Sequence, residues 1–169
     1  MPVSFLELPT EIHLLVVDLL FFRDKIRLKL TCAYFCDFIP PLCHDELLAA
    51  ETSDYAKDRD LYACRYCLRL LPASQFADRM LRKRRGKYGR DVDRRFCVEC
   101  GLKPRDGAAR YGPGAEVTIA GVFYVICISC RSFQRGAYNR QGGHTLQCES
   151  CWLESEKRRQ SQRRQIGGH

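Results

Sequence analysis

The chain has 169 residues, enough for one ordinary domain or two small ones. Its hydrophobic fraction of 46% and charged fraction of 28% are typical of globular proteins and exclude a disordered chain. The longest apolar run, Ile12 to Phe22, contains Asp18 and is much shorter than the roughly 20 residues of a membrane span, so no membrane partner is expected.

Composition divides the chain into four parts. Residues 3–45 are apolar with helical spacing, and residues 46–60 are polar and predict a linker. Residues 61–153 contain cysteine pairs, glycines and short β-branched runs, and residues 154–169 form a basic polar tail. We therefore expect a small α+β fold, with an N-terminal three-helix segment followed by a β-rich module. Because no basic leader or cleavage site is evident, an intracellular protein, nuclear or cytoplasmic, is expected.

The N-terminal segment predicts three short helices. The first begins near Pro9, which suits the first turn of a helix, and runs to about Leu20. Its apolar residues occupy more than one face, so it needs burial on two sides. Pro40 and Pro41 end the helical region. About 40 residues cannot bury that much apolar surface alone, so either the rest of the chain or a partner is expected to cover it.

The stretch LELPTEIHLLVVDLLFFRDKIRLKLTCAYFCDFI resembles the F-box, about a quarter of the chain. The matching residues are Leu8, Pro9, Glu11, Ile12, Leu15, Leu19, Asp24, Cys32 and Phe35. The second helix departs from the usual pattern at residues 27–30. The resemblance implies docking onto a Skp-type adaptor of a cullin-based ubiquitin ligase, and it implies partner-binding roles for Leu8, Pro9, Glu11, Ile12, Leu15 and Leu19.

Four Cys-x-x-Cys pairs lie in the second half of the chain. They are Cys64/Cys67, Cys97/Cys100, Cys127/Cys130 and Cys148/Cys151. Two intervening residues allow a tight turn to point two thiolates at one ion, and tetrahedral zinc takes two such turns. Eight ligands therefore predict two structural Zn²⁺ sites in a zinc-ribbon-like module, whose folding depends on metal. The fourfold repetition and the absence of a βαβ context argue against a thioredoxin-like redox motif.

Two ligand groupings are compatible with this spacing. Sequential pairing joins the first pair with the second and the third with the fourth, whereas a cross-brace joins alternate pairs. Sequential pairing is favoured, because 26 residues separate Cys100 from Cys127 and a RING-like module needs its middle ligands close together. The run Val122–Ile126 and the segment Val117–Ile119 predict a hairpin that carries the third pair.

The remaining cysteines and histidines predict no site. Cys32, Cys36 and Cys43 are expected in the core of the helical region, because free cysteine behaves as a small apolar residue. His13 is expected on a helix surface. His144, four residues before Cys148, is expected to be a loop residue rather than a ligand.

Basic residues concentrate from Arg79 to Arg95 and from Lys157 to Arg164. The first stretch lies between two cysteine pairs and contains Asp91 and Asp93, which favours a solvated loop. Acidic protein is the next most favoured contact of this loop, followed by nucleic acid. The second stretch predicts an exposed helix or tail.

The favoured function is that of a substrate-adaptor subunit of an SCF-type ubiquitin ligase, not itself an enzyme. The F-box would dock the Skp-type adaptor and the zinc module would capture a protein target, an arrangement similar to that of fungal F-box proteins with cysteine-rich modules. The alternative is a zinc-stabilised nucleic-acid-binding or general protein-interaction module. No catalytic constellation accompanies the cysteines, which disfavours an enzyme.

Overall fold

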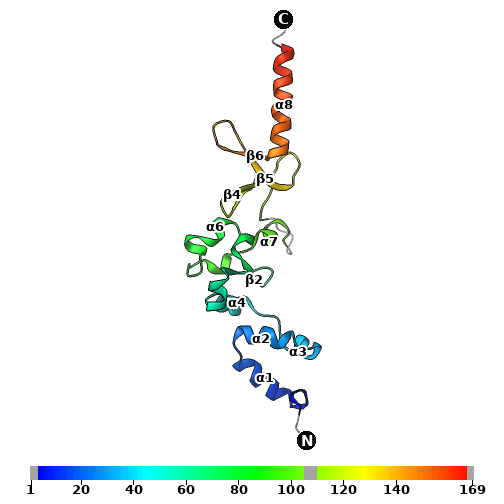
Figure 1. The fold of residues 1–169 in the computed structure, drawn as a ribbon, viewed down its shortest axis with the longest axis vertical. Coiled ribbons are helices and arrows are strands. Elements are labelled where there is room, and N and C mark those ends of the chain that lie inside the picture. The colour runs from blue at the N-terminus through cyan, green and yellow to red at the C-terminus, as the bar shows by residue number, and fades with distance from the viewer. Residues whose placement is uncertain (1–3, 105–109, 167–169) are drawn as a thin grey trace. The chain divides into compact units, whose positions relative to one another are not determined.

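The computed structural model describes residues 4–104 and 110–166 (Figure 1). Three stretches of the predicted parts of the chain lie outside the described residues. They are residue 3 of the predicted N-terminal segment, residues 105–109 of the predicted β-rich module and residues 167–169 of the predicted tail. The chain divides into two compact units, Met1–Glu46 and Leu47–His169. Across the described residues, no helix combines the length and the apolar character needed to cross a membrane.

The first unit, called the head, is built from short helices. They are η1 (Phe5–Glu7), α1 (Thr10–Leu19), α2 (Phe22–Lys29) and α3 (Ala33–Phe38). The prediction of three short α-helices in this segment is confirmed. Pro9 is the residue immediately before α1, where its missing N–H disrupts no helical hydrogen bond. The helix α3 ends at Phe38, two residues before Pro40 and Pro41.

The core of the head is small and aromatic. Val17, Phe35 and Ile39 are buried together. His13 joins them with 1% exposure, so its predicted surface position is wrong. It lies four residues before Val17, on the same face of α1. Its ring nitrogens are satisfied inside the head, Nδ1 by the Tyr34 hydroxyl at 2.8 Å and Nε2 by the Phe5 carbonyl oxygen at 2.7 Å.

Three cysteines were predicted to lie in the core of the helical region, and the structure places one of them there. Cys32 packs against the head core, whereas Cys36 and Cys43 are exposed. Cys36 follows the buried Phe35 directly in α3, and neighbouring residues on a helix point in directions about 100° apart. Cys43 lies just before the next helix, where its sulfur accepts the backbone N–H of Glu46 at 3.5 Å.

The segment predicted as a linker is largely helical. It contains most of α4 (His44–Glu51) and all of α5 (Asp54–Asp58). Ser53 caps α5 by accepting the backbone N–H of Ala56 at 3.4 Å. Glu51, despite its charge, is buried.

The second unit begins with a two-stranded hairpin and several short helical turns. Strand β1 (Leu61–Cys64) pairs antiparallel with β2 (Arg69–Pro72). Next come η2 (Ala73–Gln75), α6 (Asp78–Leu81), η3 (Lys83–Arg85), η4 (Val92–Arg94) and α7 (Val98–Leu102). Their largest fully buried apolar side chains are Phe76 and Met80. Most of this segment is polar, so the packed interior is concentrated near the cysteines.

A four-stranded antiparallel sheet and a long helix complete the second unit. The sheet has the order β3 (Glu116–Ile119), β4 (Val122–Ile126), β5 (Phe133–Tyr138), β6 (His144–Cys148). The predicted hairpin is confirmed as β3–β4. Its turn residues Ala120 and Gly121 have φ values of +48° and +78°, as a tight two-residue hairpin requires. The described part of the predicted basic tail, residues 154–166, belongs to α8 (Glu149–Ile166).

Candidate metal centres

The structure brings the eight predicted cysteine ligands into two groups of four. Site one contains Cys64, Cys67, Cys97 and Cys100, and site two contains Cys127, Cys130, Cys148 and Cys151. Within each group all four sulfur atoms lie within 4.8 Å of one another. This is the sequential arrangement, so the structure groups the pairs as predicted and not as a cross-brace.

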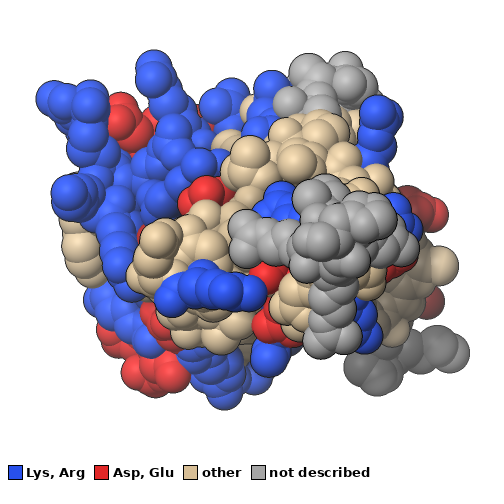
Figure 2. Space-filling view, turned by 90° about the horizontal axis from the view of Figure 1, so that it is seen from above, with Lys and Arg blue, Asp and Glu red and all other residues tan. Residues whose placement is uncertain are grey.

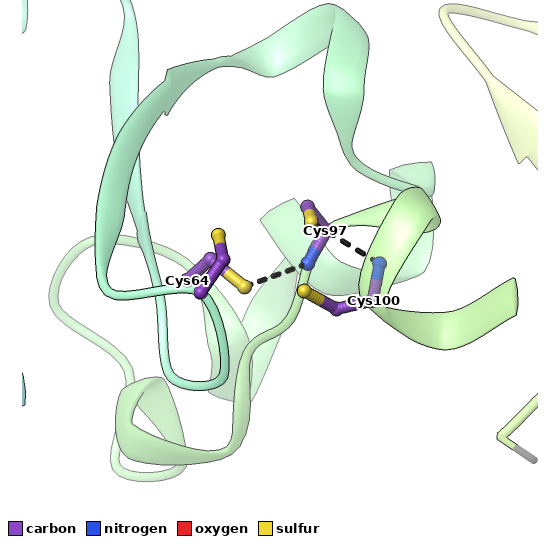
Figure 3. A group of neighbouring side chains, drawn as sticks. Cys64, Cys97 and Cys100 are labelled. Carbon is purple, nitrogen blue, oxygen red and sulfur yellow. Dashed lines mark hydrogen bonds between the residues drawn. The ribbon is translucent and has the colours of Figure 1, made fainter. Parts of the chain in front are cut away.

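Site one forms where a hairpin meets a helix start (Figure 3). Cys64 ends β1, and Cys67 lies in the turn that leads to β2. Cys97 is the N-cap of α7, and Cys100 lies inside that helix. The backbone N–H of Cys97 donates to the Cys64 sulfur at 3.3 Å, and that of Cys100 donates to the Cys97 sulfur at 3.4 Å. The N–H groups at this helix start therefore favour thiolates.

Site two is assembled from the sheet and α8. Cys127 follows β4, and Cys130 lies in the turn before β5. Cys148 ends β6 and Cys151 lies in the first turn of α8. The Ser129 backbone N–H donates to the Cys127 sulfur at 3.4 Å. Site two is more open than site one, since Cys130 is exposed whereas three of the four site-one cysteines are buried.

Hydrogen bonding lowers the pKa of one thiol in site one, Cys64, and of two thiols in site two, Cys127 and Cys148. Contact with Cys97 lowers the pKa of Cys64 to about 4, and the same contact raises the pKa of Cys97 above its ordinary value. Burial raises the pKa of Cys127, but backbone N–H groups, beginning with that of Cys130, outweigh it and bring this pKa to about 6. Because metals bind thiolates, the contacts that lower a pKa favour the ligating form of that sulfur.

The sulfur geometry fits a tetrahedral metal ion. With a Zn–S bond of about 2.3 Å, the four sulfurs around a zinc ion lie about 3.8 Å apart. The Cys130 and Cys148 sulfurs are separated by 3.8 Å. Four thiolates fill a tetrahedral shell and leave no position for a reactive water, so each group can hold a structural ion. His144 belongs to neither group. Its ring stacks on that of Phe123, with the two ring centroids 3.9 Å apart.

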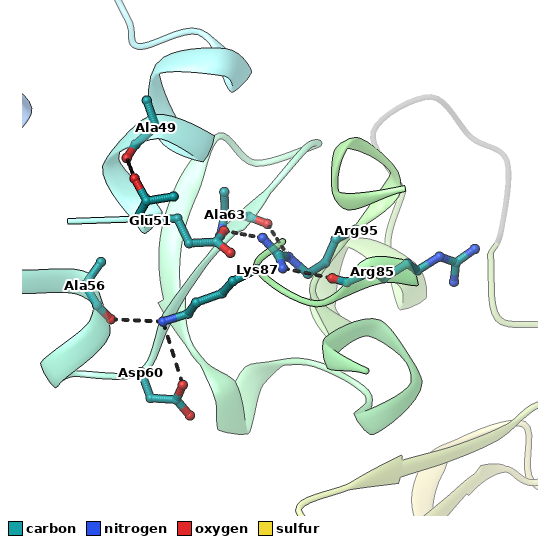
Figure 4. Close-up of polar contacts among 9 residues, drawn as sticks. Ala49, Glu51, Ala56, Asp60, Ala63, Arg85, Lys87 and Arg95 are labelled. Atoms are coloured by element: carbon teal, nitrogen blue, oxygen red, sulfur yellow. Dashed lines mark hydrogen bonds and ion pairs between the residues drawn. The ribbon is translucent and has the colours of Figure 1, made fainter. Parts of the chain in front are cut away.

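A buried ion pair, which the sequence does not reveal, supports site one (Figure 4). Arg95 lies two residues before Cys97, and its side chain is completely buried against the carboxylate of Glu51. Its Nε also donates to the carbonyl of Ala63, next to Cys64, at 3.2 Å. Glu51 in turn accepts the Ala63 N–H at 2.7 Å. The pair thus connects α4 to the backbone beside both cysteine pairs of site one.

The predicted partner-binding residues of the head are mostly exposed. Pro9, Glu11, Ile12, Leu15 and Leu19 reach the surface, and Leu8 is half-buried. Leu19 is 83% exposed and Leu15 is 60% exposed. Four large apolar residues of α1 (Ile12, Leu14, Leu15 and Leu19) are exposed, and an interaction surface is indicated by such a cluster rather than by any single exposed leucine.

No family model, curated protein or solved structure matches the chain.

Proposed function

We propose that the chain is a substrate-adaptor subunit of a cullin-based ubiquitin ligase. Its head docks a Skp-type adaptor, and its two sites each bind one structural Zn²⁺ and shape the module that captures a protein target. The Leu-Pro-x-Glu-Ile sequence at residues 8–12 carries the resemblance to the F-box. Exposed apolar side chains of the head support the proposed docking.

The observation that carries the proposal is the apolar surface of the head. Leu19 and Phe21 are each 83% exposed, and Leu30 is 80% exposed. Meanwhile the small core of Val17, Phe35 and Ile39 is closed. Exposure of these apolar side chains to water is unfavourable. A partner that covers them stabilises the complex by about 25 cal/mol per Å² of apolar surface buried.

Zinc is proposed as the metal because four thiolates in a closed tetrahedral shell are its usual structural ligand set. Bound zinc would fix the hairpin and the sheet in place and would take no part in a reaction. Ubiquitin transfer would belong to other subunits of the ligase.

Docking is tested with a surface substitution that leaves the head core intact. Leu19→Asp puts a charge on the proposed docking surface, and we expect adaptor capture in a pull-down to fall by at least about tenfold, since a buried unpaired carboxylate costs more than 1.4 kcal/mol. The matched control is Leu153→Asp on α8, where the leucine is 59% exposed and adaptor capture is expected to stay unchanged.

Equal capture of the wild type and the Leu19→Asp variant would reject this docking surface. Failure of the wild-type chain to capture the adaptor, with zinc bound, would reject the adaptor function itself.

A further inference from the structure

A hollow of about 750 Å³ opens beside α6, η3 and the start of β3. Five cationic side chains line it, those of Arg79, Arg82, Lys83, Arg84 and Arg85. Viewed from the C-terminal end, Lys and Arg side chains gather on the side of the molecule where Figure 1 draws α6 (Figure 2). The basic stretch, predicted as a solvated loop, therefore shapes a concave surface.

Three carboxylates also line the hollow, and each already has a partner. Asp78 accepts two backbone N–H groups of the β3–β4 turn, at 2.8 and 3.1 Å, and pairs with Arg82 at 3.5 Å. Asp91 pairs with Arg84 at 2.9 Å, and Glu116 pairs with His144 at 3.1 Å. The lining residues therefore have two more positive than negative side chains. Their carboxylates connect neighbouring segments through hydrogen bonds and ion pairs.

Three of the cations form no ion pair with any carboxylate that the structure describes. The Arg79 guanidinium lies over the ring of Tyr111, 5.1 Å from its centroid, and the Arg85 Nη1 contacts the Met80 sulfur at 3.2 Å. These contacts orient the guanidinium groups without neutralising them. Lys83 is exposed at the edge of the hollow.

The basic segment is held in a fixed conformation. The carbonyl oxygen of Arg84 accepts the Asp91 N–H at 2.8 Å, and that of Arg85 accepts the guanidinium of the buried Arg95 at 2.9 Å. Gly89 approaches the Arg84 carbonyl so closely that a Cβ there would lie 2.1 Å from its oxygen. Because the backbone that carries these cations is already ordered, binding of an anion does not have to order it.

We propose that this hollow binds a phosphorylated segment of a protein. A phosphate monoester carries a charge of about −1.5 to −2 at pH 7, which matches the excess charge, and arginine guanidiniums bind its oxygens in pairs. Nucleic acid is a poorer fit, because none of the described lining residues has an aromatic ring for a base, and the carboxylates of the lining would meet a continuous phosphate backbone. Calling the bound segment a ligase target rests on the proposed function, whereas the phosphate site does not.

The test uses the full zinc-loaded chain and two bead-bound degenerate peptide libraries that differ only in one central residue, phosphoserine or serine. We expect binding to the phosphorylated library alone. The double substitution Arg82→Ser with Lys83→Ser is expected to weaken that binding by at least about tenfold, given the strength of charge-assisted hydrogen bonds.

The matched control is Arg158→Ser with Arg159→Ser on α8, which removes two exposed cations elsewhere and is expected to leave binding unchanged. Zinc content and circular dichroism verify that both variants fold. Equal binding of the two libraries, equal loss in both variants, or no binding would overturn the proposal. Binding of oligonucleotides instead, with a steep dependence on salt, would replace it with a nucleic-acid site.

Adaptor capture by the same variants separates this proposal from the proposed function. Intact capture with no phosphopeptide binding rejects only the phosphate site. Phosphopeptide binding by a chain that captures no adaptor rejects only the ligase function.

Discussion

At the scale of single residues, the charged group with the greatest structural consequence is one that never reaches solvent. Arg95 belongs by sequence to the basic stretch, yet its guanidinium is buried against Glu51 and donates to two backbone carbonyls. Removing water from two charges is costly, and these hydrogen bonds offset much of that cost, although Oε1 of Glu51 has no hydrogen-bond partner among the described residues. Loss of either side chain would leave the other buried and unpaired.

Replacing Arg95 with Met should therefore lower the free energy of unfolding of the zinc-loaded second unit by about 3–5 kcal/mol. Urea denaturation followed by circular dichroism measures this change. The exposed pair Arg158–Glu154 on α8, at 2.6 Å, provides the control, because Arg158→Met should cost less than about 1 kcal/mol. A double variant that also carries Glu51→Leu should recover much of the loss. Similar costs for Arg95→Met and Arg158→Met would contradict the role of the buried pair.

Residue-level positions were the least predictable from sequence. His13 has a polar side chain in an apolar helix, which suggested the surface, but Tyr34 and the Phe5 carbonyl satisfy both ring nitrogens in the core. Glu51 and Arg95 are 44 residues apart, and no local pattern links them. In each case burial depends on a partner that only the tertiary structure brings near.

At the scale of elements, the two sites differ in their protection from solvent. Site one lies between the β1–β2 hairpin and α7, with three buried cysteines, whereas Cys130 of site two is exposed. A chelator reaches an exposed ligand more easily than a buried one. The two ions should therefore leave the chain at different rates.

We expect EDTA to remove zinc from the wild-type chain in two phases, with site two releasing first. The zinc that remains on the chain after rapid desalting, measured at successive times, follows the release. The fast phase should be missing in a Cys148→Ser variant, which lacks a site-two ligand, and the slow phase should be missing in Cys97→Ser. A single phase in the wild type, or the opposite assignment, would contradict the difference in protection.

The elements that carry the cysteines were largely predictable. Cys-x-x-Cys spacing requires a tight turn, and the alternating β-branched run before Cys127 indicated the strand that leads into it. The helix α5 was missed because its five residues are mostly polar, whereas α4 was missed although its residues 47–51 are strong helix formers. Their burial depends on contacts such as that of Glu51 with the Ala63 N–H.

At the scale of the whole molecule, the division into two compact units suits an adaptor that binds two partners. The head, whose described residues are 4–46, has its own aromatic core and an exposed apolar surface. The second unit contains both cysteine sites and the basic hollow. Docking and target capture would thus use separate surfaces, and damage to one unit would spare the other.

The most direct test is native mass spectrometry of the purified full chain mixed with a Skp-type adaptor. The account predicts a complex of one chain with one adaptor that carries two zinc ions. The Cys97→Ser variant should form the same complex with one zinc ion fewer, because its head is unchanged. A chain that binds two zinc ions and remains free of the adaptor would contradict the central claim.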